Sequence, residues 1–322
     1  REPTAFRAWG MPTPAAPVCL IFSHAERAVR SWARHPPGSP LPPLASLRPP
    51  VSVLSACFRS DGIVPTLATG RSNHPQFLHP PGYFSTRTLF RGFGLRLRDP
   101  LLLAAVRISH PGRAQEAICR GVDLHAICPI LHLLRSHPRS PLRDVPRWDV
   151  ITAFSGADVF CGGLRTLRIP HRLVGASEPL PFCRALVQAV HHQLPAHAFP
   201  HDAASPAATV HASPSHLAFW GFPCGPSSGL RRHLCPDTHD ELLTLLDAAL
   251  DYVRIHRPPV FLLENVPALL GRHRWVLDRL LSLLTASDMP TYEWYWDVIC
   301  PTEFGGVFSR PRLFLLGWIP IP

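Results

Sequence analysis

The pattern of hydrophobic and polar positions divides the chain near residue 148. Beyond this point, short apolar stretches that suit buried strands alternate with longer segments whose apolar residues recur at helical spacing. Strands are expected at 149–154, 173–178, 216–220 and 260–263, helices at 182–192, 240–256 and about 275–285, and a hairpin-like strand pair at 292–299 and 313–317. Such alternation predicts an α/β domain over residues 149–322.

The segment 240–256 is the clearest predicted helix. Asp240 and Glu241 stand at its start, and Arg254 and His256 stand near its end, which suits the helix dipole at both ends. In an open α/β sheet, ligands bind beyond the carboxyl ends of the strands. Candidate functional residues are therefore expected where the predicted strands end.

Prolines punctuate almost every stretch before residue 148. Pairs of prolines at 36–37, 42–43, 49–50 and 80–81 interrupt helices and central strands alike. One segment, 114–134, could form a short helix that Pro129 interrupts. Residues 1–148 are therefore predicted to be a Pro/Arg-rich, largely irregular and poorly ordered region.

Charge follows the same division. Residues 1–148 hold 19 arginines and 7 acidic residues, a balance of +12, whereas residues 149–322 hold 13 and 15, a balance of −2. Arginines could neutralise nucleic-acid phosphates, but the absence of lysine and the proline content favour a solvated arm with a coding bias. No stretch of about 18 or more apolar residues and no signal peptide is evident, so no membrane association is expected.

The 9 cysteines and 19 histidines form no recognised metal or disulfide pattern. There is no Cys-x-x-Cys pair and no His-Glu-x-x-His motif, so no metal site is predicted. A reducing, intracellular compartment is expected, and the nucleus if the source is a eukaryote. Protein partners and oligomeric state cannot be inferred from the sequence.

Two segments at the ends of predicted strands contain candidate catalytic residues. The loop 221–228 holds Cys224 next to prolines, a setting that suits a thiol nucleophile, although a lone cysteine is more often a small buried side chain. The strand at 260–263 delivers Glu264 to its carboxyl end, where burial could keep the carboxyl group protonated. An isolated glutamate of this kind is more often a helix-starting acid or part of a surface ion pair.

Together these segments resemble the DNA (cytosine-5) methyltransferase family. The family's nucleophile loop, Gly-Pro/Phe-Pro-Cys-x-x-x-Ser, is matched at 221–228, and its Glu-Asn-Val motif is matched at 264–266. Its Gln-x-Arg-x-Arg motif is matched in part by Arg310 and Arg312, ahead of a predicted strand. Three motifs in family order are more specific than any one of them.

The resemblance implies a Rossmann-like core that binds S-adenosylmethionine, with a mostly parallel sheet and helices on both faces. The residues Phe154, Ser155 and Gly156 resemble the start of the family's cofactor loop. Most members continue with two glycines where this chain has Asp158 and Val159, and the loop is most similar to the de novo branch.

Further cofactor contacts are implied by the same resemblance. Glu178 is expected to bind the ribose hydroxyls, and Asp202 is expected beside the adenine; Pro223 and Asn265 are the remaining expected contacts. Gly162 and Gly163 are expected to supply backbone freedom that the two missing glycines would otherwise give.

The implied reaction methylates C5 of cytosine. Cys224 is expected to add to C6 of the base, Glu264 to protonate N3, Arg310 to contact O2, and Arg312 to support the loop or a phosphate. The base is expected to leave the duplex first.

Several departures from the family keep alternatives open. Phe308 replaces the motif's glutamine, Gly225 follows the nucleophile, and the chain ends before a target-recognition domain and the late motifs, which predicts a partial chain. The leading interpretation is a DNA cytosine-5 methyltransferase. The alternatives are the same reaction on tRNA, an inactive methyltransferase-like scaffold, and a nucleic-acid-binding protein that acts through its basic half.

Overall fold

The computed structural model of the chain describes residues 64–65, 76–78, 81–83, 90–96, 98–108, 117–118, 121–154, 156–194, 213–222, 237–271, 273–286, 288–306 and 308–321.

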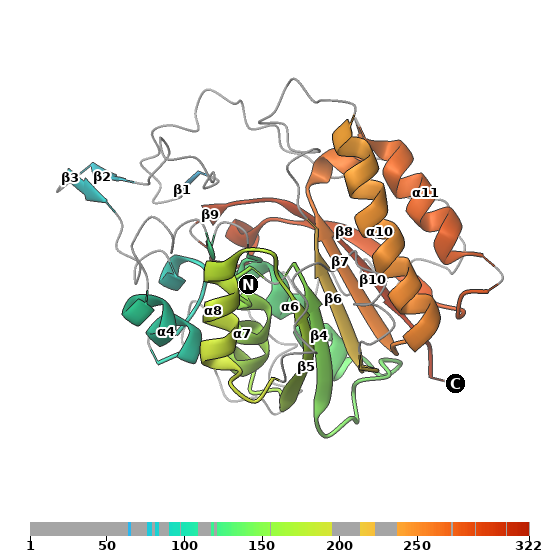
Figure 1. Ribbon diagram of the computed structural model, residues 1–322, viewed down its shortest axis with the longest axis horizontal. Helices are drawn as coiled ribbons and strands as arrows, with labels where there is room; N and C mark the ends of the chain where they lie inside the picture. The colour runs from blue at the N-terminus through green and yellow to red at the C-terminus, as the bar shows by residue number, and fades with distance from the viewer. Residues whose placement is uncertain are drawn as a thin grey trace, which may run out of the picture.

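A six-stranded sheet forms the centre of the described structure (Figure 1). Its strands follow the order β5 (His171–Ser177), β4 (Trp148–Ala153), β6 (Leu217–Gly221), β7 (Val260–Asn265), β10 (Arg312–Trp318) and β8 (Glu293–Ile299). The first four are parallel, and β10 is antiparallel to both of its neighbours. The predicted α/β class with a mostly parallel sheet is confirmed.

Helices cover both faces of this sheet, as Figure 1 shows. One side carries α4 (Pro100–Ile108), α6 (Leu124–Ser136), α7 (Val159–Thr166) and α8 (Pro181–Val190), and the other carries α10 (Asp237–His256) and α11 (Arg274–Leu284). Side chains on a strand point alternately to its two faces. Val260 and Leu262 of β7 accordingly join the first core, whereas Phe261 and Leu263 join the second.

Several shorter elements lie around this core. The strand β1 (Val64–Pro65) pairs in parallel with β9 (Phe308–Ser309), and β2 (Gln76–Leu78) pairs with β3 (Pro81–Tyr83) in an antiparallel ladder. Two 3₁₀ helices, η5 (Pro267–Leu270) and η6 (Pro301–Phe304), follow β7 and β8.

Helix α6 corrects the expectation for the segment before β4. The side chain of Asp123 caps it by accepting a hydrogen bond of 2.8 Å from the backbone N–H of His125. Pro129 lies inside the helix and does not end it, although an internal proline costs about 3 kcal/mol. Packing explains the difference, because most of the helix is buried and its side chains pack against α7.

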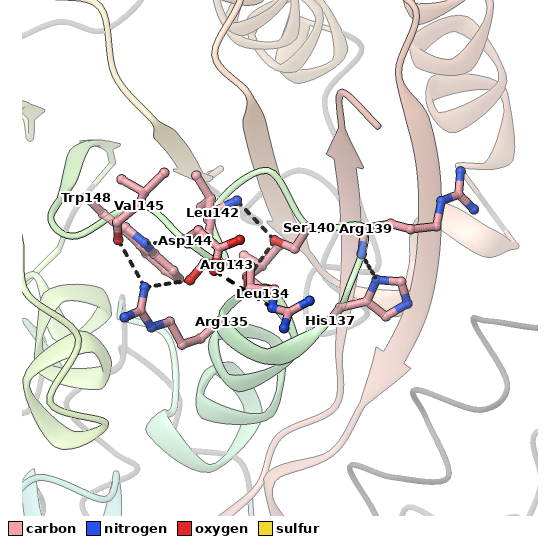
Figure 2. Close-up of polar contacts among 10 residues, drawn as sticks. All are labelled: Leu134, Arg135, His137, Arg139, Ser140, Leu142, Arg143, Asp144, Val145 and Trp148. Atoms are coloured by element: carbon pink, nitrogen blue, oxygen red, sulfur yellow. Dashed lines mark hydrogen bonds and ion pairs between the residues drawn. The ribbon is translucent and has the colours of Figure 1, made fainter. Parts of the chain in front are cut away.

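The connection from α6 to β4 is fixed by side-chain hydrogen bonds to backbone carbonyls (Figure 2). The guanidinium of Arg135 donates to the carbonyls of Arg143 and Val145, at 2.8 and 3.0 Å. The buried hydroxyl of Ser140 donates to the carbonyl of Leu134, and the indole of Trp148 donates to that of Leu142 at 3.1 Å. These bonds satisfy carbonyls that a short turn leaves without strand or helix partners.

The predicted boundary at residue 148 therefore does not mark the start of the packed core. Buried residues of α4 and α6 belong to the same apolar cluster as α7 and the sheet. The residues that the structure describes between 90 and 148 thus include two helices, α4 and α6, that pack into this core. Within the described part of the chain, no helix is both long enough and apolar enough to cross a membrane.

Candidate active site

The carboxyl ends of three parallel strands meet at one edge of the sheet. Gly221, the last residue of β6, pairs with Glu264 of β7, and Ala153, the last residue of β4, pairs with Trp220 of β6. Just beyond these ends, the rings of Phe154 and Phe222 lie 5.8 Å apart between centroids. The strand ends thus form the kind of edge at which α/β proteins bind ligands.

Glu264 is the acidic group at this edge. Only 12% of its side chain is exposed, and its carboxylate pairs with Arg312 at a distance of 2.9 Å from Nε to Oε1. Burial raises the pKa of Glu264 above its ordinary value, and the charges of Arg312 and Arg310 partly oppose that rise. A raised pKa favours the protonated acid, which can donate a hydrogen bond to a ring nitrogen.

Arg310 and Arg312 reach Glu264 because β10 runs antiparallel to β7. This direction sets the start of β10 beside the end of β7, with Phe314 directly opposite Glu264. Arg310 precedes β10, is 5% exposed, and places its guanidinium carbon 5.7 Å from the ring centre of Phe93. Arg312 contacts Glu264 directly, and Arg310 lies two residues earlier at the same end of β10, so the three predicted catalytic residues lie at one edge of the sheet.

Phe93 is a residue of this site that the sequence did not reveal. Its buried ring supports Arg310 through a cation–π contact and lies 4.8 Å from the ring of Phe308, centroid to centroid. It comes from the proline-punctuated region, and no periodicity or motif there distinguishes it from the other aromatic residues.

Asn265 and Gly221 shape the same edge in different ways. The side-chain oxygen of Asn265 accepts a hydrogen bond of 2.7 Å from the backbone N–H of Val266, so the buried amide holds the turn after β7. A Cβ added at Gly221 would lie 3.7 Å from Oε2 of Glu264, an ordinary contact. The Gly221 backbone therefore lies within van der Waals range of the carboxyl group.

The loop after β4 has the backbone conformation that glycine-rich loops adopt. Phe154, Gly156 and Asp158 have φ angles of 55°, 54° and 54°, in the left-handed region. Asp158 keeps this conformation although it carries a side chain, which costs about 1–2 kcal/mol relative to glycine. The described residues of the loop thus include three left-handed positions, one of them at Asp158, which stands where a glycine is common in the family.

Glu178 closes this loop against the end of β5. Its Oε2 accepts a hydrogen bond of 2.8 Å from the backbone N–H of Gly156, and its Oε1 accepts one of 2.9 Å from Leu180. Glu178 as a residue is 4% exposed. The Gly156 amide and the Glu178 carboxyl group are thus joined at the loop where the sequence predicts the cofactor.

Gly162 and Gly163 do not supply the expected backbone freedom. They lie inside helix α7, and neither is among the residues with positive φ. A Cβ at Gly163 would come 3.0 Å from Leu131 and 3.2 Å from Ile127. Gly163 allows the close approach of α7 to α6, and a Cβ at Gly162 would come 2.9 Å from Leu95, whereas the left-handed positions are in the loop before the helix.

The other predicted site residues are Ser155, Asp202, Pro223 and Cys224, and all four lie outside the described residues. Their roles as cofactor contacts and nucleophile remain predictions.

Comparison with known proteins identifies the family of the chain. The family model described as C-5 cytosine-specific DNA methylase matches residues 154–319, which is just over half of the 322 residues. The chain is similar to the Dnmt2 methyltransferase of S. pombe, with 18% identity, a TM-score of 0.41 and coverage of 55% of this chain and 51% of that one. No curated protein sequence matches the chain.

The methyltransferase EhMeth of Entamoeba histolytica is similar to the same extent, with 17% identity, a TM-score of 0.41 and coverage of 55% of this chain and 54% of that one. The chain thus spans about half the length of the solved structures it matches.

Proposed function

The chain belongs to the C-5 cytosine-specific DNA methylase family, and we propose that it transfers a methyl group from S-adenosylmethionine to C5 of cytosine in DNA through a covalent bond to Cys224. The observation that carries this proposal is the convergence of Glu264, Arg310 and Arg312 at the sheet edge where β6 leads into the Cys224 loop.

Cys224 is the proposed nucleophile. It follows Phe222 by two residues in the sequence, and two residues span at most roughly 7 Å. Phe222 in turn follows Gly221, whose backbone pairs with that of Glu264. The chain is therefore short enough to bring the thiol and the carboxyl group to the same base.

The chemistry of cytosine explains why this pair is needed. C5 is too weak a nucleophile to take up a methyl group unaided. Addition of the Cys224 thiolate to C6 makes C5 enamine-like, and a proton held by Glu264 on N3 offsets the charge that develops in the ring. Loss of the C5 proton after methyl transfer then expels the thiolate and restores the aromatic base.

The two arginines have different proposed tasks. Arg310, whose guanidinium lies over the ring of Phe93, is proposed to donate a hydrogen bond to O2 of the base. Arg312 holds the carboxyl group of Glu264 in position through its 2.9 Å contact. Its charge also partly opposes the rise that burial causes in the pKa of Glu264.

Phe154, Gly156 and Glu178 are proposed to hold S-adenosylmethionine, together with Ser155, Asp202, Pro223 and Asn265. Glu178 would accept hydrogen bonds from the ribose, as the acid after the second strand does in nucleoside sites. When bound, the cofactor supplies an electrophilic methyl group on a sulfonium. An intracellular location, nuclear in a eukaryote, is part of the same proposal.

Methyl transfer from labelled S-adenosylmethionine tests the reaction and its substrate together. The full chain should label a cytosine-containing DNA duplex, and Cys224→Ser should reduce labelling by more than about 10³-fold. Cys300→Ser is the matched control, because Cys300 is a partly buried free thiol whose Sγ lies 3.1 Å from the Thr302 hydroxyl and which has no task in the proposed reaction.

Parallel reactions on tRNA separate the two substrates. Labelling of tRNA without labelling of DNA would replace the proposed substrate and leave the chemistry intact. Equal labelling by the wild-type chain and Cys224→Ser would overturn the covalent mechanism.

A further inference from the structure

A cluster of three potential metal ligands lies beside the cofactor loop and is not used by the proposed reaction. Asp158, Cys161 and His191 each offer one ligand atom, and these atoms all lie within 4.8 Å of one another. We propose that they form a binding site for a divalent transition metal ion, with Zn²⁺ as the best-suited ion.

The local fold explains how the three side chains meet. Asp158 precedes α7 and Cys161 lies three residues later, a spacing that puts both on one side of a helix. His191 ends α8, and its Nε2 lies 2.6 Å from Oδ2 of Asp158. The site thus joins the end of the cofactor loop to the neighbouring helix.

Asp158 shows features that helix capping does not explain. It occupies the N-cap position of α7, yet its side chain makes no capping hydrogen bond. Its carboxyl group is buried, and Oδ1 has no nitrogen or oxygen donor among the described residues. The remaining polar neighbour is the thiol of Cys161, a weak donor. A buried carboxylate oxygen without a strong donor, on a residue with an unfavourable left-handed backbone, indicates that this carboxylate binds a ligand.

The charges in the cluster suit a dication. A thiolate and a carboxylate together carry two negative charges, so a bound M²⁺ ion would leave the buried group neutral. The nearby guanidinium of Arg165 does not upset this balance, because it forms two hydrogen bonds of 3.1 and 3.0 Å to the carboxylate of Asp99. A thiolate and an imidazole favour zinc over magnesium or calcium.

The distances require only small adjustments. Ligand atoms around one tetrahedral zinc ion lie roughly 3.3–3.8 Å apart, so atoms up to 4.8 Å apart must approach by at most about 1 Å, and His191 Nε2 and Asp158 Oδ2, now 2.6 Å apart, must separate by roughly 0.7 Å. His191 is the most exposed of the three, with 14% of its side chain accessible, and gives the ion a route from solvent. Three protein ligands leave a fourth position for water.

Cobalt(II) titration of the full chain tests the site without any methyl-transfer assay. The wild-type chain should bind one equivalent of Co²⁺ with a thiolate-to-cobalt band in the near ultraviolet, and Zn²⁺ should displace it. Cys161→Ala should lose the band. Cys183→Ala is the matched control, because Cys183 is also a buried free thiol, on α8, and should keep it.

Two further variants test the site independently, in case Cys161→Ala fails to fold. Asp158→Asn and His191→Gln should each weaken Co²⁺ binding by more than about 100-fold, beyond the effect of a change outside the ligand set. Circular dichroism should show that both remain folded. Absence of the band in the wild-type chain, or its persistence in Cys161→Ala, would mean that the cluster is an ordinary hydrogen-bonded group and would overturn the proposal.

Discussion

Glu264 is subject to two opposing influences within the site. Burial raises the pKa of its carboxyl group above the ordinary value of 4.5, while Arg312 and Arg310 lower it. The folded chain therefore holds this proton to higher pH than the unfolded chain does. Its contribution to stability is complete below pH 4.5 and is lost as the pH rises through the folded pKa.

The proposed reaction needs this proton, so Glu264→Gln should both slow methyl transfer and change its pH dependence. We expect a loss of about 10²–10⁴-fold, which is typical when a general acid is removed. The wild-type rate should fall on the alkaline side as Glu264 ionises, and the glutamine variant should lack that fall. Single-turnover rates measured across pH check both effects.

Arg312→Gln provides a second test of the role of Glu264 ionisation. Since the charge of Arg312 lowers the pKa of Glu264, its removal should move the alkaline fall to higher pH. Asp278→Asn, which changes an exposed acid on α11, should leave the profile unchanged. An alkaline fall that survives in Glu264→Gln would assign it to another group.

At the residue scale, sequence and structure agree where a motif identifies the residue. Glu264, Arg310 and Arg312 could be found because their spacing is a family pattern, and the antiparallel pairing of β7 and β10 brings them together. Phe93 could not be found, because its role depends on a contact more than two hundred residues along the chain.

Among the elements, the pairing of β7 with β10 determines where the site residues lie. Gly317 of β10 stands directly opposite Phe261 of β7. A Cβ at Gly317 would lie 2.2 Å from two carbons of the Phe261 ring, which is fully buried. The glycine therefore lets an aromatic ring fill the space between the strand pair and the helices on that face.

Gly317→Ala should destabilise the protein, because the buried ring has little room to move. We expect a loss of about 1–3 kcal/mol in the free energy of unfolding, the usual cost of overpacking a core. Chemical denaturation measures this loss.

Gly271→Ala is the matched control, since no atom lies within 4 Å of a Cβ at that position. Its stability should stay within about 0.5 kcal/mol of the wild type. Equal stability of the two variants would show that the Phe261 ring can move aside.

Most strands and helices beyond residue 148 could be predicted because their apolar periods are clear, whereas helix α7 was not predicted. Each expected strand or helix there is present with bounds shifted by a few residues at most. The segment around Pro129 could not be predicted in the same way. Its helix depends on packing against α7, and a local rule for proline does not include that burial.

For the whole molecule, the packed core includes residues before position 148. The side chains of Leu124, Ile127 and Leu131 in α6 fill the space over Gly163 of α7. The composition of residues 1–148 predicts an irregular region. This prediction uses the proline and arginine content of the whole segment, so it does not single out the apolar helix within it. Only tertiary contacts show that this part of the chain covers one face of the sheet.

A truncation series tests this boundary. A chain beginning at residue 149 would expose the apolar face that α4 and α6 cover, and should show no cooperative unfolding or should aggregate. A chain beginning at residue 90 keeps both helices and should unfold cooperatively. Thermal unfolding of the two forms is the measurement. A 149–322 fragment with the melting temperature of the longer form would contradict the account.

The most direct test of the central claim is covalent trapping by a DNA duplex that contains 5-fluorocytosine, since fluorine at C5 prevents the elimination that frees the enzyme. With S-adenosylmethionine present, the full chain should form a denaturation-resistant adduct that Cys300→Ala retains and Cys224→Ala loses. Failure of the wild-type chain to form the adduct, or its survival in Cys224→Ala, would contradict a thiol at residue 224 that acts with Glu264 on one cytosine.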